Sequence, residues 1–276
     1  MTIELPRTAM LGVGSMSGAV LDGLLAAGLD PATVALTTKS EQSAAAHRER
    51  GLDATATDTD ADANRAAVRG AGLVVLGVKP YVIGDLLDEV SADLEPGAVV
   101  VSVAVGTTIA SMEAKVPAGV RVVRALPNTP IGVGHGVTGI SAGPSADAEA
   151  VALASSVFDV SGVVVEVPEA QLDALSAVSG SGPAYVFLLV EQWQQAAESL
   201  GFSHDQAETM VQGTLRGAVE LLAASGKEPT DLRKAVTSPK GTTERAVAVL
   251  QEARLGEVFD SATAAALARA QELAAG

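Results

Sequence analysis

The sequence contains no cysteine among its 276 residues. This absence excludes disulfide bonds, thiolate nucleophiles and zinc sites built on cysteine. Histidine is scarce as well: His47, His135 and His204 stand alone, without a second histidine at ligand spacing, so we expect no metal site. Positive charge is in the minority, because 18 Lys and Arg face 33 Asp and Glu, and the net charge is -15. Such a chain repels phosphate backbones and anionic lipid surfaces, so neither nucleic acid nor a membrane is an expected partner.

Long apolar runs and a leader sequence are also missing from the pattern. No apolar run reaches the roughly 20 residues that a membrane span needs. The first seven residues lack the charged and apolar regions of a signal peptide, so we expect a cytoplasmic protein. A length of 276 residues favours two domains, with enough apolar material to bury a core.

A glycine turn near the N-terminus predicts a nucleotide-binding fold. A short apolar run leads into Gly12-Val-Gly14-Ser15-Met16, and a helical apolar spacing follows in residues 19–28. In dinucleotide-binding folds the first glycine makes a tight turn, and the second lets a pyrophosphate approach the helix N-terminus. Ser17 stands at the third position, where glycine or alanine is usual, so the fingerprint is imperfect. The alternative interpretation is an ordinary strand-turn-helix connection.

The end of the second expected strand, residues 33–37, indicates which dinucleotide would bind. NAD-binding folds place an acidic residue here, where it accepts a hydrogen bond from the ribose 2′-hydroxyl. This chain has Thr38, Lys39 and Ser40 instead. One cation and two hydroxyls suit a 2′-phosphate, so we favour NADPH as the cofactor and keep NADH as the alternative. A solvated strand end would account for the same residues.

Further strands at α/β spacing bring more residues to the same crevice. Continuous Val and Leu runs at 73–78 and 98–104 are typical of strands buried on both faces of a parallel sheet, whose carboxyl ends line the ligand site. We therefore expect Val78, Lys79 and Pro80 beside the nucleotide, together with the backbone of Ala104–Gly106.

The last strands of this domain follow at 120–126, 137–140 and 163–167, with a helix at 146–158. The first of them ends in the rigid loop Pro127–Pro130. Asn128 of that loop either hydrogen-bonds a ligand amide or closes an Asx turn.

Strand signals end at Pro168, which indicates a domain boundary. We expect a Rossmann-type α/β domain over residues 1–167 and an all-helical domain over 168–276. A helix over 181–200 carries apolar residues around much of its circumference. A second helix begins at the capping-box pattern of Ser203 and Gln206 and continues to Gly226. Thr230 is the expected cap of a short third helix, and two further helices are expected to separate near Gly256. Wide apolar faces in a helical region of this size favour self-association.

The segment Thr237-Ser-Pro-Lys-Gly-Thr-Thr243 is rich in hydroxyl groups and glycine at an expected helix start. Pro239 prevents helix before the turn, Gly241 allows close approach of a ligand, and Thr242 or Thr243 is the expected cap. Free N–H groups at a helix start favour a carboxylate or a phosphate. A plain capped turn is the alternative interpretation of these seven residues.

Taken together, these motifs resemble pyrroline-5-carboxylate reductases, which complete proline synthesis with NAD(P)H. The resemblance spans nearly the whole chain, because its motifs occur in the order of the family: Gly12–Met16, Val78–Pro80, Arg124–Pro130, Ser179–Tyr185 and Val236–Thr243. It implies that Asn64 joins the cofactor-binding residues, and that Ser179, Ser238 and Gly241–Thr243 receive the substrate at a pocket completed by a second subunit. This chain departs from the family at Lys240, where glycine is usual, and at Leu126, where methionine is usual.

The activity that the resemblance implies is hydride transfer to the carbon of a five-membered cyclic imine, giving L-proline. A protonated iminium is already electrophilic, so the chemistry needs positioning and exclusion of water more than an acid–base pair. Ser238 and Thr243 are the predicted catalytic residues, with the Thr243 hydroxyl bonding the ring nitrogen or donating a proton through water.

Two other functions fit parts of the sequence. A β-hydroxyacid-type dehydrogenase needs a basic residue to move the alcohol proton, but residues 170–225 contain only Arg216 as a cation. A non-catalytic NADPH sensor would keep the glycine turn without needing the segment around Ser238. Another imine reductase of the same chemistry is a further alternative.

Overall fold

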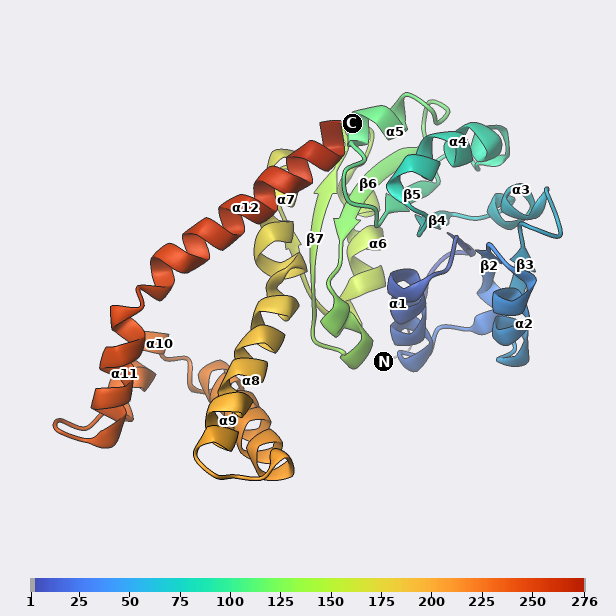
Figure 1. Cartoon of the computed structure of the whole chain (residues 1–276). Coiled ribbons are helices and arrows are strands. Elements are labelled where there is room, and N and C mark those ends of the chain that lie inside the picture. Colours follow the sequence, from blue (N-terminus) through green and yellow to red (C-terminus); the bar gives the residue numbers. More distant parts are fainter. Residues whose placement is uncertain (1–2, 276) are drawn as a thin grey trace. The chain divides into compact units, whose positions relative to one another are not determined.

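A computed structural model describes residues 3–275 of the chain (Figure 1). Two compact units make up the structure: the first holds the residues up to Ser181 together with those from Ala266 onward, and the second holds Gly182–Ala265. The two compact units separate after Ser181. The predicted domain boundary after residue 167 lies earlier in the sequence and remains a prediction.

The first unit is built on a single eight-stranded sheet with the order β3-β2-β1-β4-β5-β6-β7-β8. Strand pairs are parallel except for β6 and β7, which run antiparallel. This is the expected Rossmann-type α/β architecture. The strand order reverses between β1 and β4, and such folds bind ligands at the point of reversal. The strands are β1 (Thr8–Leu11), β2 (Val34–Thr38), β3 (Asp53–Ala56), β4 (Leu73–Leu76), β5 (Val99–Ser102), β6 (Arg121–Leu126), β7 (Gly136–Ala142) and β8 (Gly162–Glu166).

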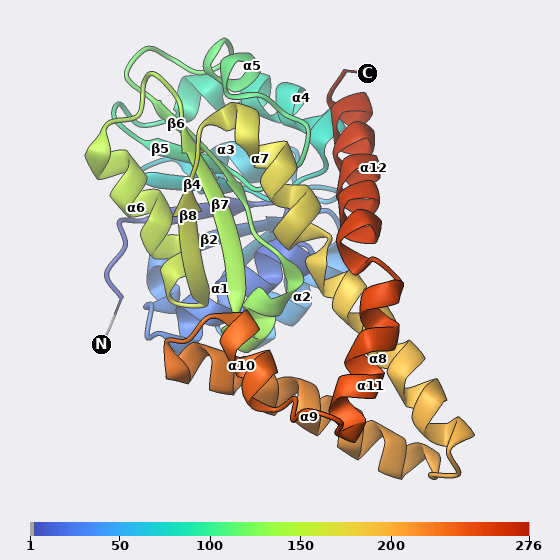
Figure 2. The same cartoon turned by 90° about the vertical axis from the view of Figure 1, so that its left-hand side faces the viewer.

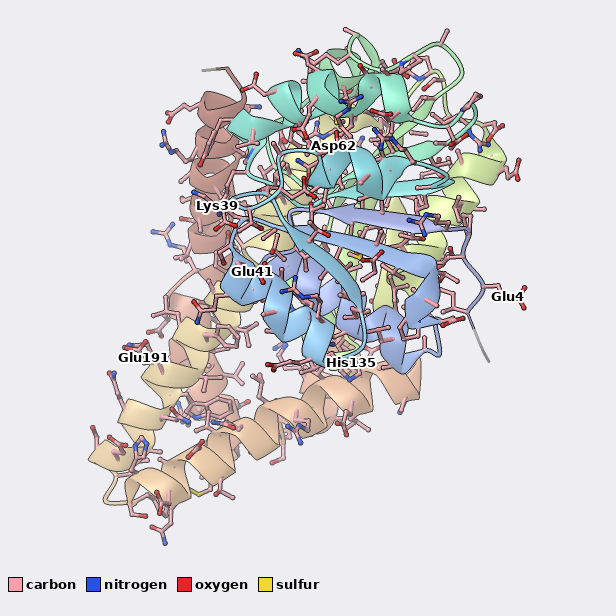
Figure 3. The ribbon with its side chains drawn as sticks, turned by 90° about the vertical axis from the view of Figure 1, so that its right-hand side faces the viewer. Glu4, Lys39, Glu41, Asp62, His135 and Glu191 are labelled. Carbon is pink, nitrogen blue, oxygen red and sulfur yellow. The ribbon has the colours of Figure 1, made fainter. Side chains whose placement is uncertain are left out.

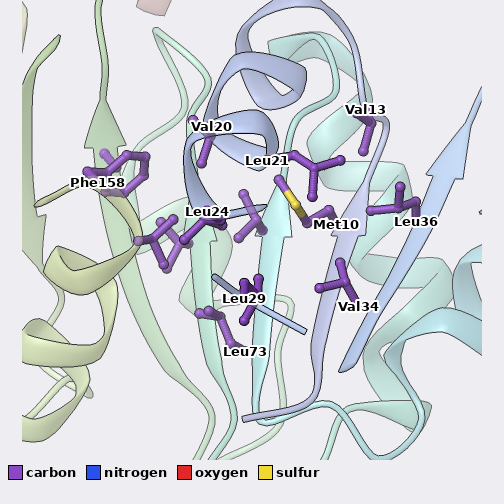
Figure 4. Close-up of a cluster of buried hydrophobic side chains, with 14 of the residues drawn as sticks. Met10, Val13, Val20, Leu21, Leu24, Leu29, Val34, Leu36, Leu73 and Phe158 are labelled. Carbon is purple, nitrogen blue, oxygen red and sulfur yellow. The ribbon is translucent and has the colours of Figure 1, made fainter. Parts of the chain in front are cut away.

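Helices cover both faces of the sheet and enclose two apolar cores. On one face Met10, Leu24 and Phe158 belong to a buried cluster that joins the strands to α1 and α6 (Figure 4). On the other face Leu76, Leu87 and Met112 belong to a second cluster with α3, α4 and α5. Residues of β1, β4 and β5 are almost completely buried because each strand is covered on both sides, which explains their unbroken apolar runs.

The connections of the first unit are short helices and turns. They are α1 (Ser15–Ala26), η1 (Pro31–Thr33), α2 (Glu41–Glu49), α3 (Ala63–Val68), α4 (Pro80–Val90), η2 (Ser91–Asp93), α5 (Ile109–Glu113), η3 (Thr129–Val133), α6 (Ala148–Asp159), α7 (Glu169–Leu175) and the π-helical turn η4 (Ser176–Gly180). Figure 2 shows β7 beside β8, with α7 lying over β7. A side chain at Gly139 of β7 would collide with Leu175 of α7, so glycine is needed for this close packing.

The second unit is helical, as expected. It contains α8 (Gly182–Ser199), α9 (His204–Ser225), α10 (Pro229–Ala235), α11 (Thr242–Glu252) and the larger part of α12 (Leu255–Ala275). The capping box at the start of α9 is formed: Ser203 accepts from Gln206 N–H, and the Gln206 side chain accepts from Ser203 N–H. Gly226 ends α9 in the left-handed conformation that glycine adopts at low cost.

Two local predictions in this region were wrong. The cap of α10 is Glu228 rather than Thr230, because Pro229 occupies the first helical position. The cap of α11 is Gly241 without any side-chain bond, and both expected caps, Thr242 and Thr243, lie inside the helix. The predicted break between the last two helices near Gly256 is confirmed: α11 and α12 separate at Ala253 and Arg254, where Arg254 has a φ of 49°.

Apolar side chains of the second unit are widely exposed. Phe187, Leu189 and Trp193 of α8 have exposed fractions of 66, 53 and 43%. Phe259 of α12 is also exposed, at 53%, although its ring meets Tyr185 edge-on with centroids 6.4 Å apart. Large exposed apolar patches mark surfaces that are covered by another molecule.

One helical stretch within residues 3–275 also meets the criterion for a membrane span by length and composition alone. It covers Glu169–Ser199, and an 18-residue window within it has a mean hydropathy of 1.3. The sequence pattern did not indicate it, because polar residues such as Ser176 and Ser181 interrupt the apolar run.

Candidate active site

The turn after β1 has the geometry of a dinucleotide-binding loop. Gly12 has a φ of 75°, and a Cβ at this position would come within 2.3 Å of the Val78 Cγ1 atom. Its N–H donates to both the carbonyl oxygen and the hydroxyl of Thr37, each at 3.0 Å. Only glycine fits here, because the conformation is left-handed and the neighbouring strand end is too close for a side chain.

The N-terminus of α1 is open for an anion. Gly14 is the cap residue, no side chain caps the helix, and its first turn holds no acidic residue. A Cβ built on Gly14 would meet nothing within 4 Å, so the space beside this glycine is free of protein atoms. Ser15 and Met16 follow as the first residues of the helix. Unsatisfied N–H groups next to open space fit the pyrophosphate of a dinucleotide.

The third position of the fingerprint is filled by Ser17, which is 2% exposed. A Cβ at Gly77, just after β4, would come within 2.0 Å of the Ser17 Oγ atom. Serine therefore fits at a position where glycine or alanine is usual, because the residue that faces it, Gly77, has no side chain. Sequence reasoning missed Gly77, although a glycine ending an apolar run was its visible signal.

The end of β2 presents the residues expected to read the ribose. Thr38 is buried, and its hydroxyl donates to the Ser40 carbonyl oxygen at 3.0 Å. Ser40 caps α2, since its Oγ atom accepts from the Ser43 N–H. Lys39 is exposed between them, and Figure 3 shows it at the same edge as Glu41. Glu41 forms an ion pair with Arg48, whereas Lys39 has no ion pair within residues 3–275.

The neighbouring strand ends complete the expected cofactor site. Lys79 is exposed and caps α4, and Pro80 is the first residue of that helix. Gly106, just beyond β5, has a φ of 85°, so the chain turns sharply after Ala104. Asn64 of α3 donates from its side chain to the Glu89 carboxylate at 3.3 Å. Its predicted contact with the cofactor thus remains a prediction, and the observed partner is an acidic residue of α4.

Asn128 ties the loop after β6 to two other segments. Its Nδ2 atom donates to the Ser179 carbonyl oxygen at 2.9 Å, and its Oδ1 atom accepts from the Val137 N–H at 2.8 Å. The side chain is 6% exposed. The structure gives Asn128 a bracing role in place of the Asx turn that was one of its two expected roles. The other, its predicted contact with the cofactor, remains a prediction.

Arg124 of β6 is a buried cation beneath the same loop. Its Nη1 atom lies 2.9 Å from Glu169 Oε1, and its Nη2 atom lies 3.7 Å from Asp173 Oδ1. The same Glu169 oxygen accepts the Ile109 N–H at 2.7 Å, so one carboxylate joins the start of α5 to β6 and α7. Two acidic partners compensate the charge of a side chain that is only 4% exposed.

The expected substrate segment forms a turn at the start of α11 in the second unit. The Gly241 N–H donates to the Ser238 carbonyl oxygen at 3.0 Å. A Cβ at Gly241 would come within 2.6 Å of the Ser238 Oγ atom, which shows how closely the serine hydroxyl lies over the helix start. Thr242 and Thr243 are exposed, and their N–H groups belong to the first turn, where a helix has no internal acceptors.

The structure therefore brings the predicted residues together in two sets. Ser238 and Gly241–Thr243 lie in one turn of the second unit. The expected cofactor residues occupy the strand ends of the first unit, where Ser179 also lies, bonded from its hydroxyl to the Leu175 carbonyl oxygen at 3.1 Å. Within residues 3–275 no group of three or more His, Asp or Glu side chains is arranged to hold a metal ion.

Comparisons with known proteins cover both units. A family model described as pyrroline-5-carboxylate reductase dimerisation matches residues 169–273, and one described as NADP oxidoreductase, coenzyme F420-dependent, matches residues 7–106. A pyrroline-5-carboxylate reductase of Corynebacterium melassecola is 37% identical over 268 residues, covering 96% of this chain and 97% of the relative. The chain belongs to the pyrroline-5-carboxylate reductase family.

Solved structures agree with this family assignment. A pyrroline-5-carboxylate reductase from Coxiella burnetii has a TM-score of 0.91 and 37% identity, covering 98% of this chain and 99% of its own. The Plasmodium falciparum enzyme, solved with NADP bound, has a TM-score of 0.84 at 23% identity, covers 98% of each chain and shares the fold. The protein is thus an oxidoreductase that reduces the carbon–nitrogen double bond of pyrroline-5-carboxylate. Its second unit lies within the dimerisation match, which accounts for the exposed apolar residues by self-association.

Proposed function

We propose that this reductase uses NADPH in preference to NADH, with the 2′-phosphate held at the end of β2. The observation that carries this proposal is Lys39, an exposed cation free of ion pairs in the described part of the chain. Ser40 adds a hydroxyl and the N-terminus of α2, and Glu41 of the same turn is paired with Arg48. The carboxylate that usually accepts from the 2′-hydroxyl of NADH is missing from Thr38–Ser40. The Plasmodium enzyme, which shares the fold, was solved with NADP.

The remaining cofactor contacts are proposed from the open strand ends. The pyrophosphate rests on the N–H groups of Ser15 and Met16 beside Gly14, where the structure leaves space. The next strand end is lined by Val78, Lys79 and Pro80. The strand end after that is lined by the backbone of Ala104–Gly106. When bound, the reduced nicotinamide supplies the hydride for the imine carbon.

The substrate carboxylate is proposed to bind at the start of α11. The N–H groups of Thr242 and Thr243 point out of the first helical turn, and the Ser238 hydroxyl lies beside them. An anion at this end is favoured by the helix dipole as well as by these donors. Holding the carboxylate here fixes the ring for attack, and such positioning contributes up to roughly 7–11 kcal/mol to catalysis. Ser179 is proposed as a further substrate-binding residue.

Thr243 is proposed to serve the ring nitrogen. Reduction adds a hydride to carbon and leaves the nitrogen as an amine, so the imine must be protonated before or during transfer. The Thr243 hydroxyl is exposed, and it is placed in the same turn as the carboxylate donors. It can hydrogen-bond the ring nitrogen or pass a proton to it through water.

The protein is proposed to associate with a second copy of itself as a homodimer and to act in the cytoplasm. The exposed residues of α8 and α12 supply an apolar surface, and the family match over residues 169–273 is to a dimerisation domain. Burial of such a surface between two copies removes it from water, which is the main favourable term in association.

The test is the initial rate of cofactor oxidation with pyrroline-5-carboxylate, measured with NADPH and with NADH. We expect a faster reaction with NADPH; a faster reaction with NADH would overturn the assignment of Lys39. Thr243→Ala should lower kcat by about 10²–10³-fold while leaving NADPH affinity intact. Thr230→Ala, which removes an exposed threonine from the first turn of α10, is the matched control. An unchanged kcat in Thr243→Ala would remove this hydroxyl from the mechanism.

A further inference from the structure

Residues Ser238–Gly241 form a β-turn with an unusual third residue. The bond from Gly241 N–H to the Ser238 carbonyl oxygen joins the fourth residue to the first at 3.0 Å. Pro239 is second, and Lys240 is third with a φ of 61°. This combination defines a type II turn, whose third position normally requires glycine. Lys240 is therefore held in a left-handed conformation that a lysine rarely adopts.

Glu244 braces this turn from inside α11. Its Oε2 atom accepts the Lys240 N–H at 2.9 Å, four residues back along the chain. A backbone N–H bonded to a carboxylate is a charge-assisted hydrogen bond, which is stronger than one between neutral groups. The contact fixes the peptide between Pro239 and Lys240, in the middle of the turn, and so it fixes the direction in which the Ser238 hydroxyl and the helix start are presented.

The same carboxylate places a negative charge at the proposed anion site. Glu244 is the third residue of α11, directly after Thr242 and Thr243, whose N–H groups are proposed to receive the substrate carboxylate. Two carboxylates at one helix start repel each other. The nearest cations in sequence are Arg245, the next residue, and Lys240, and neither forms an ion pair within residues 3–275, so neither cancels the charge of Glu244 by direct contact.

We propose that Glu244 is a positioning residue with two opposing effects on the affinity for the substrate carboxylate. Its hydrogen bond to the Lys240 N–H keeps the turn in the shape that binds the anion. Its charge weakens binding of that anion. This inference rests on the proposed function, because it assumes that the substrate carboxylate binds at the start of α11.

Two substitutions separate the two effects. Glu244→Gln keeps an oxygen acceptor for the Lys240 N–H and removes the charge, whereas Glu244→Ala removes both. At low ionic strength we expect Glu244→Gln to lower the KM for pyrroline-5-carboxylate by about threefold, and added salt to shrink this difference. Glu244→Ala should raise that KM by about fivefold because the turn loses its brace. In both variants kcat and the KM for NADPH should stay within about twofold of the wild type, since the bound substrate is still held at the same helix start and the proposed cofactor residues lie in the first unit.

Glu252→Gln is the control for net charge. Glu252 is exposed at the last residue of the same helix, about 12 Å from Glu244 at 1.5 Å per residue. Its removal should leave both KM values unchanged. A Glu244→Gln enzyme whose KM for pyrroline-5-carboxylate equals or exceeds the wild-type value would overturn the electrostatic effect, and an unchanged KM in Glu244→Ala would overturn the brace. No turnover by the wild-type enzyme would instead overturn the proposed function, and this inference with it.

Discussion

The side-chain amide of Asn128 donates a hydrogen bond to the main-chain carbonyl of Ser179, with its Nδ2 atom 2.9 Å from the carbonyl oxygen. Its Oδ1 atom accepts the N–H of Val137 at 2.8 Å. One buried side chain thus connects the loop after β6, the start of β7 and the π-helical turn. The residues involved are far apart in the sequence, so the amide holds a tertiary arrangement in place.

Removing the amide of Asn128 should destabilise the first unit. Asn128→Ala leaves a partly buried carbonyl and a partly buried N–H without their partner, and we expect the free energy of unfolding to fall by about 1–3 kcal/mol. Turnover should fall as well, because the segment around Ser179 loses its anchor. Urea denaturation at one fixed protein concentration measures the first effect. Gln171→Ala, which removes an exposed amide on α7, should change stability by less than about 0.5 kcal/mol. Equal stabilities of the two variants would contradict the bracing role.

Gly12 and Gly14 should respond differently to alanine. Gly12→Ala places a Cβ against Val78 in a left-handed conformation, so we expect it to lower the free energy of unfolding by about 2 kcal/mol or more and to abolish NADPH binding. Gly14→Ala adds a Cβ into open space with an ordinary φ of -111°, so the fold should keep its stability while NADPH binding weakens. Thermal unfolding and fluorescence titration with NADPH distinguish the two. Undiminished NADPH affinity in Gly14→Ala would show that this space is not the pyrophosphate site.

The sequence predicted those parts of the site that depend on short spacing. The glycine turn, the polar strand end at Lys39 and the exposed Lys79 follow from local pattern and from the rule that parallel strands present their carboxyl ends at one edge. Gly77 and Thr37 were missed. Their roles depend on strand pairing, which places Gly77 against Ser17 and Thr37 beside the Gly12 N–H.

Helix ends were harder to predict than helices. The expected caps Thr230, Thr242 and Thr243 are chemically suitable, but Pro229 shifts the start of α10, and the turn at Pro239–Lys240 shifts the start of α11. Gly256 indicated roughly where α12 separates from α11, but the left-handed residue at the break is Arg254, which the sequence did not indicate. Asn128 illustrates the same limit, since its two hydrogen bonds reach residues that local spacing does not bring together.

Lys39 should determine the choice of cofactor. Lys39→Ala removes the cation proposed to bind the 2′-phosphate, so we expect kcat/KM for NADPH to fall by about tenfold while the value for NADH changes little. Steady-state rates with each cofactor give both numbers. Lys115→Ala is the matched control: this lysine pairs with Asp88 of α4, so its loss should affect both cofactors equally. A parallel loss with NADPH and NADH in Lys39→Ala would contradict its role in discrimination.

Lys240 should carry a measurable conformational cost. The left-handed conformation disfavours a non-glycine residue by roughly 1–2 kcal/mol. Replacement by glycine removes this cost but raises the conformational entropy of the unfolded chain, which offsets part of the gain. Lys240→Gly is therefore expected to raise the free energy of unfolding by about 0.5–1 kcal/mol. Lys240→Ala keeps the strain and removes the same charge, so it should show no such gain. Matching denaturation curves for the two variants would mean that the turn is not strained at this residue.

Two histidines should give the stability a dependence on pH near neutrality. His47 of α2 is partly buried, and its Nδ1 atom lacks a hydrogen-bond partner in the described structure. Burial, with the nearby Arg50, lowers the pKa of His47 from its ordinary value of 6.5. The folded state therefore binds fewer protons than the unfolded chain in this range, and stability is lost as the pH falls through 6.5 towards the lowered pKa. His47→Gln should reduce this loss.

His204 should act in the opposite direction. Its ring Nδ1 atom lies 2.7 Å from the Glu198 carboxylate, and this hydrogen bond raises the pKa of His204 above 6.5. The folded state then binds more protons than the unfolded chain, so this contribution is complete below 6.5 and is lost as the pH rises through the raised pKa. Both groups of the pair are exposed, which keeps the effect small. Denaturation curves between pH 5 and 8 test both directions: the difference between wild type and His47→Gln should develop as the pH falls below 6.5, and the difference between wild type and His204→Gln should fade as the pH rises above 6.5. A difference that changes on the other side of 6.5 in either variant would contradict the pKa direction of that histidine.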